Sequence, residues 1–309
     1  MPARSRRARP GFSRAGGAKP RTDPRRTGWT FPIVGLLALV AAVAVGILLL
    51  RGGTGGGDAV SWATLGTADV HSLAFDPADK EHIYFGHHGG LLESRDGGRS
   101  WQPTALSGAD AMNVSTSADG LMQIAGHEVY LESRDGGLTW QPVPNDLPGL
   151  DLHAFVTDPD DPAHAWAFAV GHGLFETTDA GRHWEQRQPD SYGALTIFES
   201  DGAPVLVGLT QIGIARSDDG GRTWQPLGTP FGQVASLAAS ADGGVLYAGT
   251  TGGLQRSTDV GMTWSPTGLP NLALTIAIPN GDDEVVAVVD DETRFYRSSD
   301  GGTTWPGPR

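Results

Sequence analysis

The chain has 309 residues, among them 45 Gly, 21 Pro, 9 Trp and no Cys. Gly at about 15 %, roughly twice its usual share, together with abundant Trp favours short strands and tight turns and argues against a helical bundle. The absence of Cys excludes a disulfide scaffold, a cysteine nucleophile, a thiolate metal site and a lipidated cysteine. Any bound metal must therefore use His, carboxylate or Met ligands.

Charge is distributed unevenly along the chain. Residues 1–30 contain nine Lys and Arg and one Asp, a net charge of +8, whereas the whole chain carries −13. The remainder therefore carries −21. A negative charge of this size repels nucleic acid and anionic headgroups, so we expect the remainder to bind neither, while sites for cations or basic partners stay open.

Residues 31–50 are a candidate membrane span. These 20 residues carry no charge and end at Arg51, and at a rise of 1.5 Å per residue they match a hydrocarbon core of roughly 30 Å. The preceding cations place the basic tail 1–30 in the cytoplasm and the rest outside. A cleaved signal peptide is the alternative, because Ala42-Val43-Ala44 resembles a cleavage site. We expect a retained single-pass transmembrane helix in the cell membrane.

An eight-residue pattern recurs six times beyond a Gly-rich linker over residues 51–59. Its Trp residues are 39, 44, 40, 40 and 41 residues apart. Short apolar runs bounded by turn residues separate the copies, which predicts four strands in each unit of about 40 residues. The sequence thus predicts an all-β, six-bladed β-propeller over residues 60–309.

The pattern, SRDGGLTW at residues 133–140, resembles the Asp-box or BNR repeat, S-x-D-x-G-x-T-W, of sialidase-like β-propellers. The chain is also similar to bacterial WD40/YVTN/BNR-like propellers often labelled glycosyl hydrolase or exo-sialidase. Six equivalent carboxylates cannot flank one site, so we interpret the boxes as structural turns with a Trp anchor. The structural box residues are Asp96, Trp101, Asp135, Trp140, Asp179, Trp184, Asp219, Trp224, Asp259, Trp264, Asp300 and Trp305.

The two chain ends are expected to close the ring together. Only Pro-Gly-Pro-Arg follows the last box, which is too short and too rich in Pro for an outer strand. Residues 61–66 resemble the strands that follow the boxes, such as residues 223–228. We therefore predict that residues 61–66 supply the fourth strand of blade six.

The resemblance implies an active site on the face away from the boxes. A sialidase also needs three convergent arginines, but most arginines here lie in or beside boxes and no Arg-Ile-Pro element occurs. We therefore do not expect sialidase activity. Photosystem II assembly factors and sortilin-type receptors resemble the same repeat and act by binding protein, so the resemblance also implies a recognition platform.

Histidines gather at the predicted channel mouth of blades one to three. Asp69, Asp110 and Asp151 are each 41 residues apart and precede His71, Met112 and His153 by two residues. Imidazole and thioether groups bind copper or zinc, and the Asp residues could orient the rings. Polar groups that only satisfy the channel backbone are the alternative. His82, His164 and His183 map to the box face. The candidate metal or ligand residues are His71, His87, His88, Met112, His127, His153 and His172.

We therefore predict a membrane-anchored, extracytoplasmic propeller that acts as a non-catalytic binding module for a protein or glycan. A transition metal, copper or zinc, is the expected cofactor if one binds at the mouth. The alternative is a glycoside hydrolase acting on external glycans, with an acid pair from Asp69, Asp110, Glu128 and Asp151. Such a pair requires two carboxyl groups about 5–10 Å apart.

Overall fold

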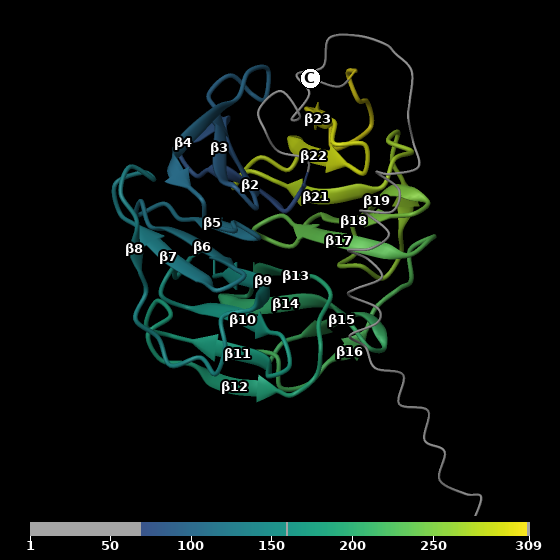
Figure 1. The fold of residues 1–309 in the computed structure, drawn as a ribbon. Coiled ribbons are helices and arrows are strands. Elements are labelled where there is room, and N and C mark those ends of the chain that lie inside the picture. Colours follow the sequence, from purple (N-terminus) through teal and green to yellow (C-terminus); the bar gives the residue numbers. More distant parts are fainter. Residues whose placement is uncertain (1–68, 159, 308–309) are drawn as a thin grey trace, which may run out of the picture.

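The computed structural model describes residues 69–158 and 160–307, which form six antiparallel sheets arranged in a ring (Figure 1). The predicted all-β, six-bladed propeller is confirmed. Blades one to three contain β1 (Ser72–Asp76), β2 (Asp79–His87), β3 (Gly90–Ser94), β4 (Gln102–Ser107), β5 (Asn113–Thr116), β6 (Met122–Gly126), β7 (Val129–Ser133), β8 (Gln141–Pro142), β9 (Leu152–Thr157), β10 (Ala165–Ala169), β11 (Gly173–Thr177) and β12 (Glu185–Gln188). Blades four to six contain β13 (Leu195–Ser200), β14 (Ala203–Thr210), β15 (Gly213–Ser217), β16 (Gln225–Pro226), β17 (Val234–Ala239), β18 (Leu246–Thr250), β19 (Gly253–Ser257), β20 (Ser265–Pro266), β21 (Ala273–Ala277), β22 (Val286–Asp290) and β23 (Phe295–Ser298).

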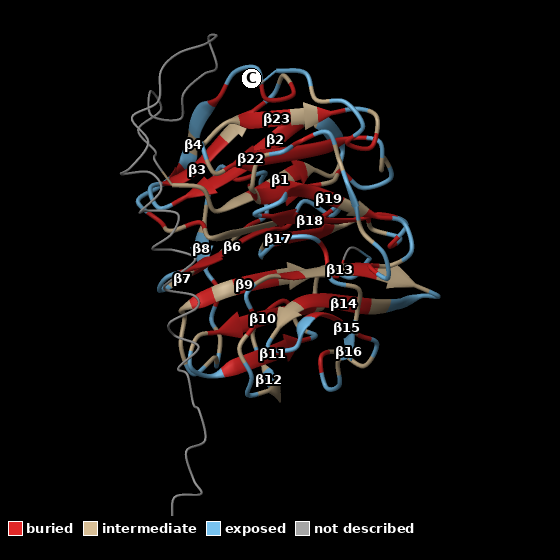
Figure 2. Cartoon of the chain, turned by 90° about the vertical axis from the view of Figure 1, so that its right-hand side faces the viewer, coloured by how far each residue is buried: buried red, intermediate tan, exposed pale blue. Residues whose placement is uncertain are grey.

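Burial changes with distance from the ring axis (Figure 2). The second strand of a blade is covered on both faces by neighbouring blades, and β6, β10, β18 and β22 are buried at every residue. Such strands are continuously apolar, as in AWAFA of β10, because neither face meets water. The fourth strands are short and exposed, as in β8, β16 and β20. The core therefore lies between blades and not within any one of them.

Each box is a turn held by one carboxylate. In the second blade, Asp135 Oδ1 accepts the amides of Leu138 and Thr139 at 3.1 and 2.9 Å, and Oδ2 accepts the Thr139 hydroxyl at 2.6 Å. Gly136 and Gly137 take φ of 72° and 82°, a region that favours glycine. The Trp140 Nε1 donates to Gly137 O at 3.0 Å within the box, and its ring packs against the core between blades one and two.

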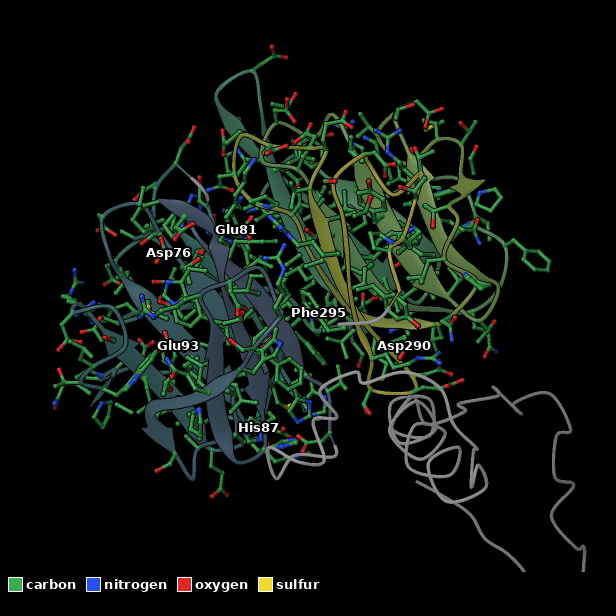
Figure 3. All side chains as sticks on the ribbon, turned by 90° about the horizontal axis from the view of Figure 1, so that it is seen from above. Asp76, Glu81, His87, Glu93, Asp290 and Phe295 are labelled. Atoms are coloured by element: carbon green, nitrogen blue, oxygen red, sulfur yellow. The ribbon has the colours of Figure 1, made fainter. Side chains whose placement is uncertain are left out.

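The ring closes between the first and last blades. Leu73 N in β1 donates to Thr275 Oγ1 in β21 at 3.1 Å, and the ring centroids of Trp101 and Phe295 are 5.4 Å apart. Figure 3 shows Phe295 where blade six faces blade one. In the described residues, blade six has three strands, β21, β22 and β23. The predicted closing strand, residues 61–66, lies outside the described residues.

The predicted basic tail, membrane span and linker, residues 1–59, also lie outside the described residues. Within the part of the chain that the structure describes, no helix is long and apolar enough to cross a membrane.

Candidate functional site

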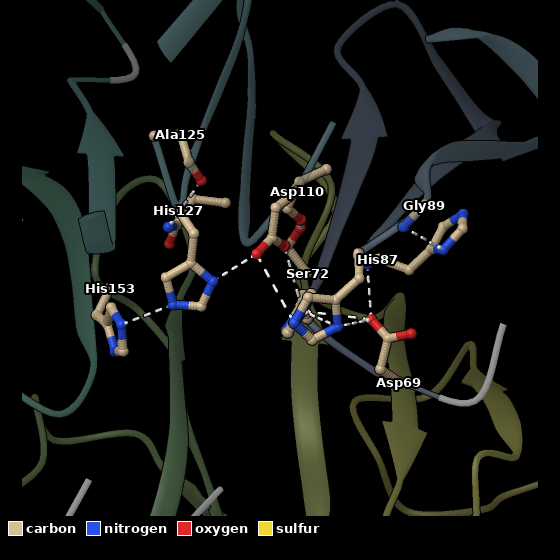
Figure 4. A network of polar contacts seen from close by, with 12 residues as sticks. Asp69, Ser72, His87, Gly89, Asp110, Ala125, His127 and His153 are labelled. Carbon is tan, nitrogen blue, oxygen red and sulfur yellow. Dashed lines mark hydrogen bonds and ion pairs between the residues drawn. The ribbon is translucent and has the colours of Figure 1, made fainter. Parts of the chain in front are cut away.

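The candidate site lies at the end of the ring away from the boxes, which we call the mouth. It comprises the hairpin loops between the second and third strands and the segments that enter the innermost strands. Below it, a cavity of about 370 Å³ is lined by the innermost strands, with His71, Met112 and His153 among its lining residues. Figure 4 shows His153, His127 and Asp110 in one row, with Asp69 beyond them. We call the whole set the histidine cluster: Asp69, His71, His88, Asp110, His127, Asp151 and His153.

The cluster repeats one Asp–His pair in two blades. The loop His88-Gly89 joins β2 to β3 and the loop His127-Glu128 joins β6 to β7, so each His is the first loop residue. Each faces the Asp that enters the same blade. His88 Nδ1 lies 2.7 Å from Asp69 Oδ2, and His127 Nδ1 lies 2.5 Å from Asp110 Oδ2. Because an ionised carboxylate only accepts hydrogen bonds, each Nδ1 is the donor in its pair.

The inner-strand histidines link these pairs across blades. His71 Nε2 lies 3.3 Å from Asp69 Oδ2, 3.4 Å from Asp110 Oδ1 and 3.1 Å from His88 Nδ1. His127 Nε2 lies 3.2 Å from His153 Nε2 and 3.3 Å from Asp151 Oδ1. Four imidazoles and three carboxylates therefore form one continuous polar network across blades one to three.

Burial keeps the inner imidazoles neutral. Desolvation, with the nearby His88, lowers the pKa of His71 to about 4 against the opposing effect of Asp110 and Asp69. Burial likewise lowers the pKa of His153, although Asp151 acts in the other direction. A neutral imidazole has a free lone pair on one nitrogen, which is the form that binds metals.

The structure corrects the sequence alignment of the loop histidines. The sequence grouped His87 with His127 and His172, but β2 extends through His87, which pairs with Gly90, so the hairpin loop begins at His88. His87 is buried, stacks on Phe85 and accepts the Gly89 amide at Nδ1, at 3.0 Å. Its ring turns away from the cluster (Figure 4).

Two further candidates lie outside the cluster. His172 is exposed at its loop, and the described residues give its ring no carboxylate contact. Met112 lines the channel below the cluster. One ion therefore cannot use all seven predicted ligands. The prediction that a metal binds remains untested.

Of the predicted acid residues, three lie in the histidine cluster and one lies outside it. Asp69 and Asp110 each place an oxygen within 3.4 Å of His71 Nε2, and Asp110 and Asp151 each place one within 3.3 Å of a nitrogen of His127. Glu128 is exposed, takes φ of 55° and donates its amide to Leu150 O. The carboxylates are close together, but imidazoles lie between them.

The remaining histidines lie away from the mouth. His82 is buried between Asp76 and Glu93, with nitrogen–oxygen distances of 3.1 and 2.8 Å. Figure 3 shows Asp76 and Glu93 apart from His87, which marks the mouth end of blade one. His164 Nε2 lies 2.7 Å from Glu176, and exposed His183 binds its own box Asp179 at 2.6 Å. Each of these three histidines therefore contacts a carboxylate of its own blade.

The mouth has an apolar side that sequence reasoning missed. Phe231 is 79 % exposed in the segment entering β17, and Ile212 is 62 % exposed in the loop between β14 and β15. Ile212 belongs to blade four and Phe231 to blade five, opposite the histidine-bearing blades. The available signal was an apolar residue at a loop position where a turn requires none.

Two family models match the chain, each over a different part of it. Residues 59–196 match the family of photosynthesis system II assembly factor YCF48, and residues 184–308 match the DUF6242 beta propeller domain. A search of curated protein sequences gives no significant match.

Solved structures share the fold. A structure of YCF48 bound to D1 peptide is 23 % identical, covers 77 % of this chain and 80 % of its own, and has a TM-score of 0.50. YCF48 from Cyanidioschyzon merolae is 21 % identical over 78 % of this chain and 84 % of its own, with a TM-score of 0.50. The GH74 xyloglucanase from Xanthomonas campestris is 17 % identical, with a TM-score of 0.51 over 76 % of this chain and 45 % of the enzyme. With its six recurring boxes and six blades, the chain is a BNR-type β-propeller.

Proposed function

We propose that the protein is a membrane-anchored, extracytoplasmic binding module that holds a polypeptide across its mouth. The charge pattern around residues 31–50 supports the anchor and the external location. The similarity to a YCF48 structure with a bound peptide supports a polypeptide ligand on this fold.

The observation that carries the proposal is the two-sided mouth. Blades one to three present Asp69, Asp110 and Asp151 with four imidazoles, while blades four and five present the exposed Ile212 and Phe231. Exposed aromatic groups beside a polar surface are typical of protein contact sites. The carboxylates and the chain's net charge of −13 favour a basic segment. The fitting ligand is a polypeptide with a Lys or Arg next to an apolar side chain.

The proposal includes a metal ion. The imidazole side of the mouth suits copper or zinc, because neutral imidazoles bind both and the Asp residues fix the ring orientation. The metal and the basic residue of the peptide would share the carboxylates of the imidazole side, so the two parts of the proposal are tested separately, the peptide in the presence of a chelator.

Selection from a random peptide library tests the polypeptide proposal. The full chain in detergent micelles is immobilised and probed with phage-displayed 12-residue peptides, in the presence of a chelator. We expect enrichment of peptides that carry a basic and an apolar residue. Their binding should weaken with Phe231→Ala and with Asp151→Asn. Asp201→Asn, in the exposed hairpin between β13 and β14, is the matched control. Failure to enrich, or peptides that bind all variants equally, would exclude the mouth as a peptide site.

A glycoside hydrolase is the second candidate, favoured by the closeness of Asp69 and Asp110 around His71 and by the fold shared with GH74 enzymes. A carboxylate pair can hydrolyse a glycosidic bond when one member is protonated. The test is release of reducing sugar from xyloglucan and of sialic acid from sialyllactose. Activity that is lost with Asp110→Asn would support this candidate, and inactivity on both glycans would count against it.

A further inference from the structure

We infer that His127, Asp151 and His153 form a three-ligand centre for one divalent transition-metal ion. This inference rests on the proposed function, because it names the atoms that hold the metal at the mouth. It concerns only the junction of blades two and three.

The spacing of the three donor atoms fits a metal site. His127 Nε2, His153 Nε2 and Asp151 Oδ1 are separated by 3.2, 3.3 and 3.0 Å. Ligands on a tetrahedral ion with bonds of about 2.0–2.1 Å lie about 3.3–3.4 Å apart. The three atoms therefore span one face of such a tetrahedron, with little movement needed to bind an ion. The fourth corner remains for water or for a donor atom of the ligand.

The protonation states favour a cation at this point. Because His127 donates its Nδ1 proton to Asp110, its Nε2 is an acceptor. Asp151 Oδ1 is also an acceptor; the atom itself is covered from solvent and lies 3.3 and 3.0 Å from the two imidazole nitrogens. A proton on His153 Nε2 has two acceptors to choose from, Asp151 Oδ1 at 3.0 Å and His127 Nε2 at 3.2 Å, and a linear hydrogen bond serves one of them at a time. A metal ion satisfies all three atoms at once.

Asp110 supplies the supporting contact that such centres need. Its side chain is 12 % exposed, and Oδ2 lies 2.5 Å from His127 Nδ1. A carboxylate behind a ligating imidazole fixes the tautomer and the ring orientation, and its loss typically weakens metal binding about 10–100-fold. Asp110 is therefore a positioning residue in this centre.

The blade-one pair does not offer the same arrangement. His88 Nδ1 faces both Asp69 and His71 but already donates to Asp69 at 2.7 Å. Its other nitrogen lies 3.7 Å from Asp110 Oδ2, an oxygen that already accepts the Nδ1 proton of His127. The triangle of two imidazole nitrogens and one carboxylate oxygen therefore lies at the junction of blades two and three.

The side chains that form the centre are partly exposed to solvent. The side chains of His127, Asp151 and His153 are 44 %, 48 % and 25 % exposed. Two imidazoles and one carboxylate suit zinc or copper ions, and one carboxylate leaves the loaded centre with a charge of +1. Zn²⁺ is the probe for affinity and Cu²⁺ is the probe for ligand type.

Calorimetry with Zn²⁺ is the first test. The full chain in detergent micelles is stripped with a chelator, dialysed and titrated. We expect one equivalent of Zn²⁺ to bind and the affinity to fall at least about 10-fold with His127→Gln or His153→Gln. His172→Gln is the matched control, since it removes a mouth imidazole outside the triangle and should leave binding unchanged. Asp110→Asn should weaken binding about 10–100-fold while the ligands stay in place.

Electron paramagnetic resonance of the Cu²⁺ form gives an independent readout. We expect coupling to two imidazole nitrogens in the wild type and in Asp110→Asn, and to one in either ligand variant. Stoichiometric binding that persists in the His127→Gln/His153→Gln double variant, or the absence of two coupled nitrogens in the wild type, would overturn the inference. If a ligand variant fails to fold, the nitrogen count of the wild type decides alone. Because the peptide selection is run with chelator, failure of the metal centre leaves the polypeptide proposal standing, and the reverse also holds.

Discussion

The Gln211 side chain donates from Nε2 to Asp190 Oδ1 at 3.2 Å in blade four. Gln211 is the first residue of the β14–β15 loop, as His127 is of the β6–β7 loop, and Asp190 precedes its innermost strand as Asp110 does. The same side-chain contact therefore occurs in a blade without the imidazole. The hydrogen bond belongs to the scaffold, and the imidazole adds a free nitrogen.

This relationship predicts that His127→Gln leaves the fold intact. The amide should remake the hydrogen bond to Asp110, so we expect the free energy of unfolding to change by less than about 1 kcal/mol. His127→Ala removes the donor and should cost more, on the order of 1–2 kcal/mol. Urea unfolding with chelator present measures both. Equal losses for Gln and Ala would show that the imidazole itself stabilises the mouth.

The sequence was sufficient for the architecture because each box is a local structure. Ser133, Asp135 and Gly137 lie within five positions, so their contacts can be recognised without knowing the rest of the fold. The His–Asp pairs are different, since His88 and Asp69 meet only through the pairing of β1 with β2, and the β2–β3 register decides which residue begins the loop. One extra residue in β2 moved the loop position from His87 to His88. Periodicity of the repeat cannot reveal a hairpin that differs by one residue.

The apolar side of the mouth was missed for another reason. Phe231 and Ile212 lie 19 residues apart in the sequence, and no spacing rule relates their exposure. Their significance comes from sharing a face with the histidine cluster. That relationship depends on ring closure and not on local pattern.

Acid should weaken the propeller through its boxes. Hydrogen bonds from the Thr139 hydroxyl and amide lower the pKa of Asp135 to about 2, and Thr263 has the same effect on Asp259. An unfolded Asp has a pKa of about 3.9, so between about pH 4 and pH 2 the unfolded chain binds protons more readily than the folded chain. The stability from each box is complete above about pH 4 and is lost as the pH falls toward 2.

Urea unfolding between pH 7 and pH 2.5 measures this effect. We expect the urea concentration at the unfolding midpoint to decrease once the pH drops below about 4. The decrease should be smaller in Asp135→Asn, whose amide does not titrate. Asp201→Asn is the control, because Asp201 lies in an exposed hairpin outside the boxes. A midpoint that stays constant down to pH 2.5 would contradict the role of the box carboxylates.

Ring closure predicts unequal effects for two phenylalanines. Phe295 is 1 % exposed and packs on Trp101 across the junction of blades one and six, with ring centroids 5.4 Å apart. Phe295→Ala should cost about 3–5 kcal/mol of unfolding free energy, because it leaves a cavity at that junction. Phe231→Ala should change it by less than about 0.5 kcal/mol, since that side chain is 79 % exposed. Similar losses in a urea titration would contradict the described packing.

The predicted fourth strand of blade six can be tested by two proline substitutions. In blade four, Gln225 pairs with Arg216 and Pro226 pairs with Ala215, and Leu227 N donates to Ile214 O. Hydrogen-bonded positions alternate along an antiparallel strand, so the Pro226 position needs no amide donor while its neighbours do. A proline stands at the equivalent position of β4, β8 and β20: Pro103, Pro142 and Pro266.

Alignment of residues 61–66 with residues 223–228 places Ala63 at the Gln225 position and Thr64 at the Pro226 position. If the segment pairs with β23 as predicted, Thr64→Pro should leave the melting temperature unchanged. Ala63→Pro removes a ladder donor and should cost on the order of 1–3 kcal/mol, with faster hydrogen exchange of the β23 amides. Equal effects of the two substitutions would mean that this segment does not complete blade six. Because the substitutions are adjacent and both introduce proline, a difference between them reports the pairing register and not a general effect of proline on the N-terminal chain.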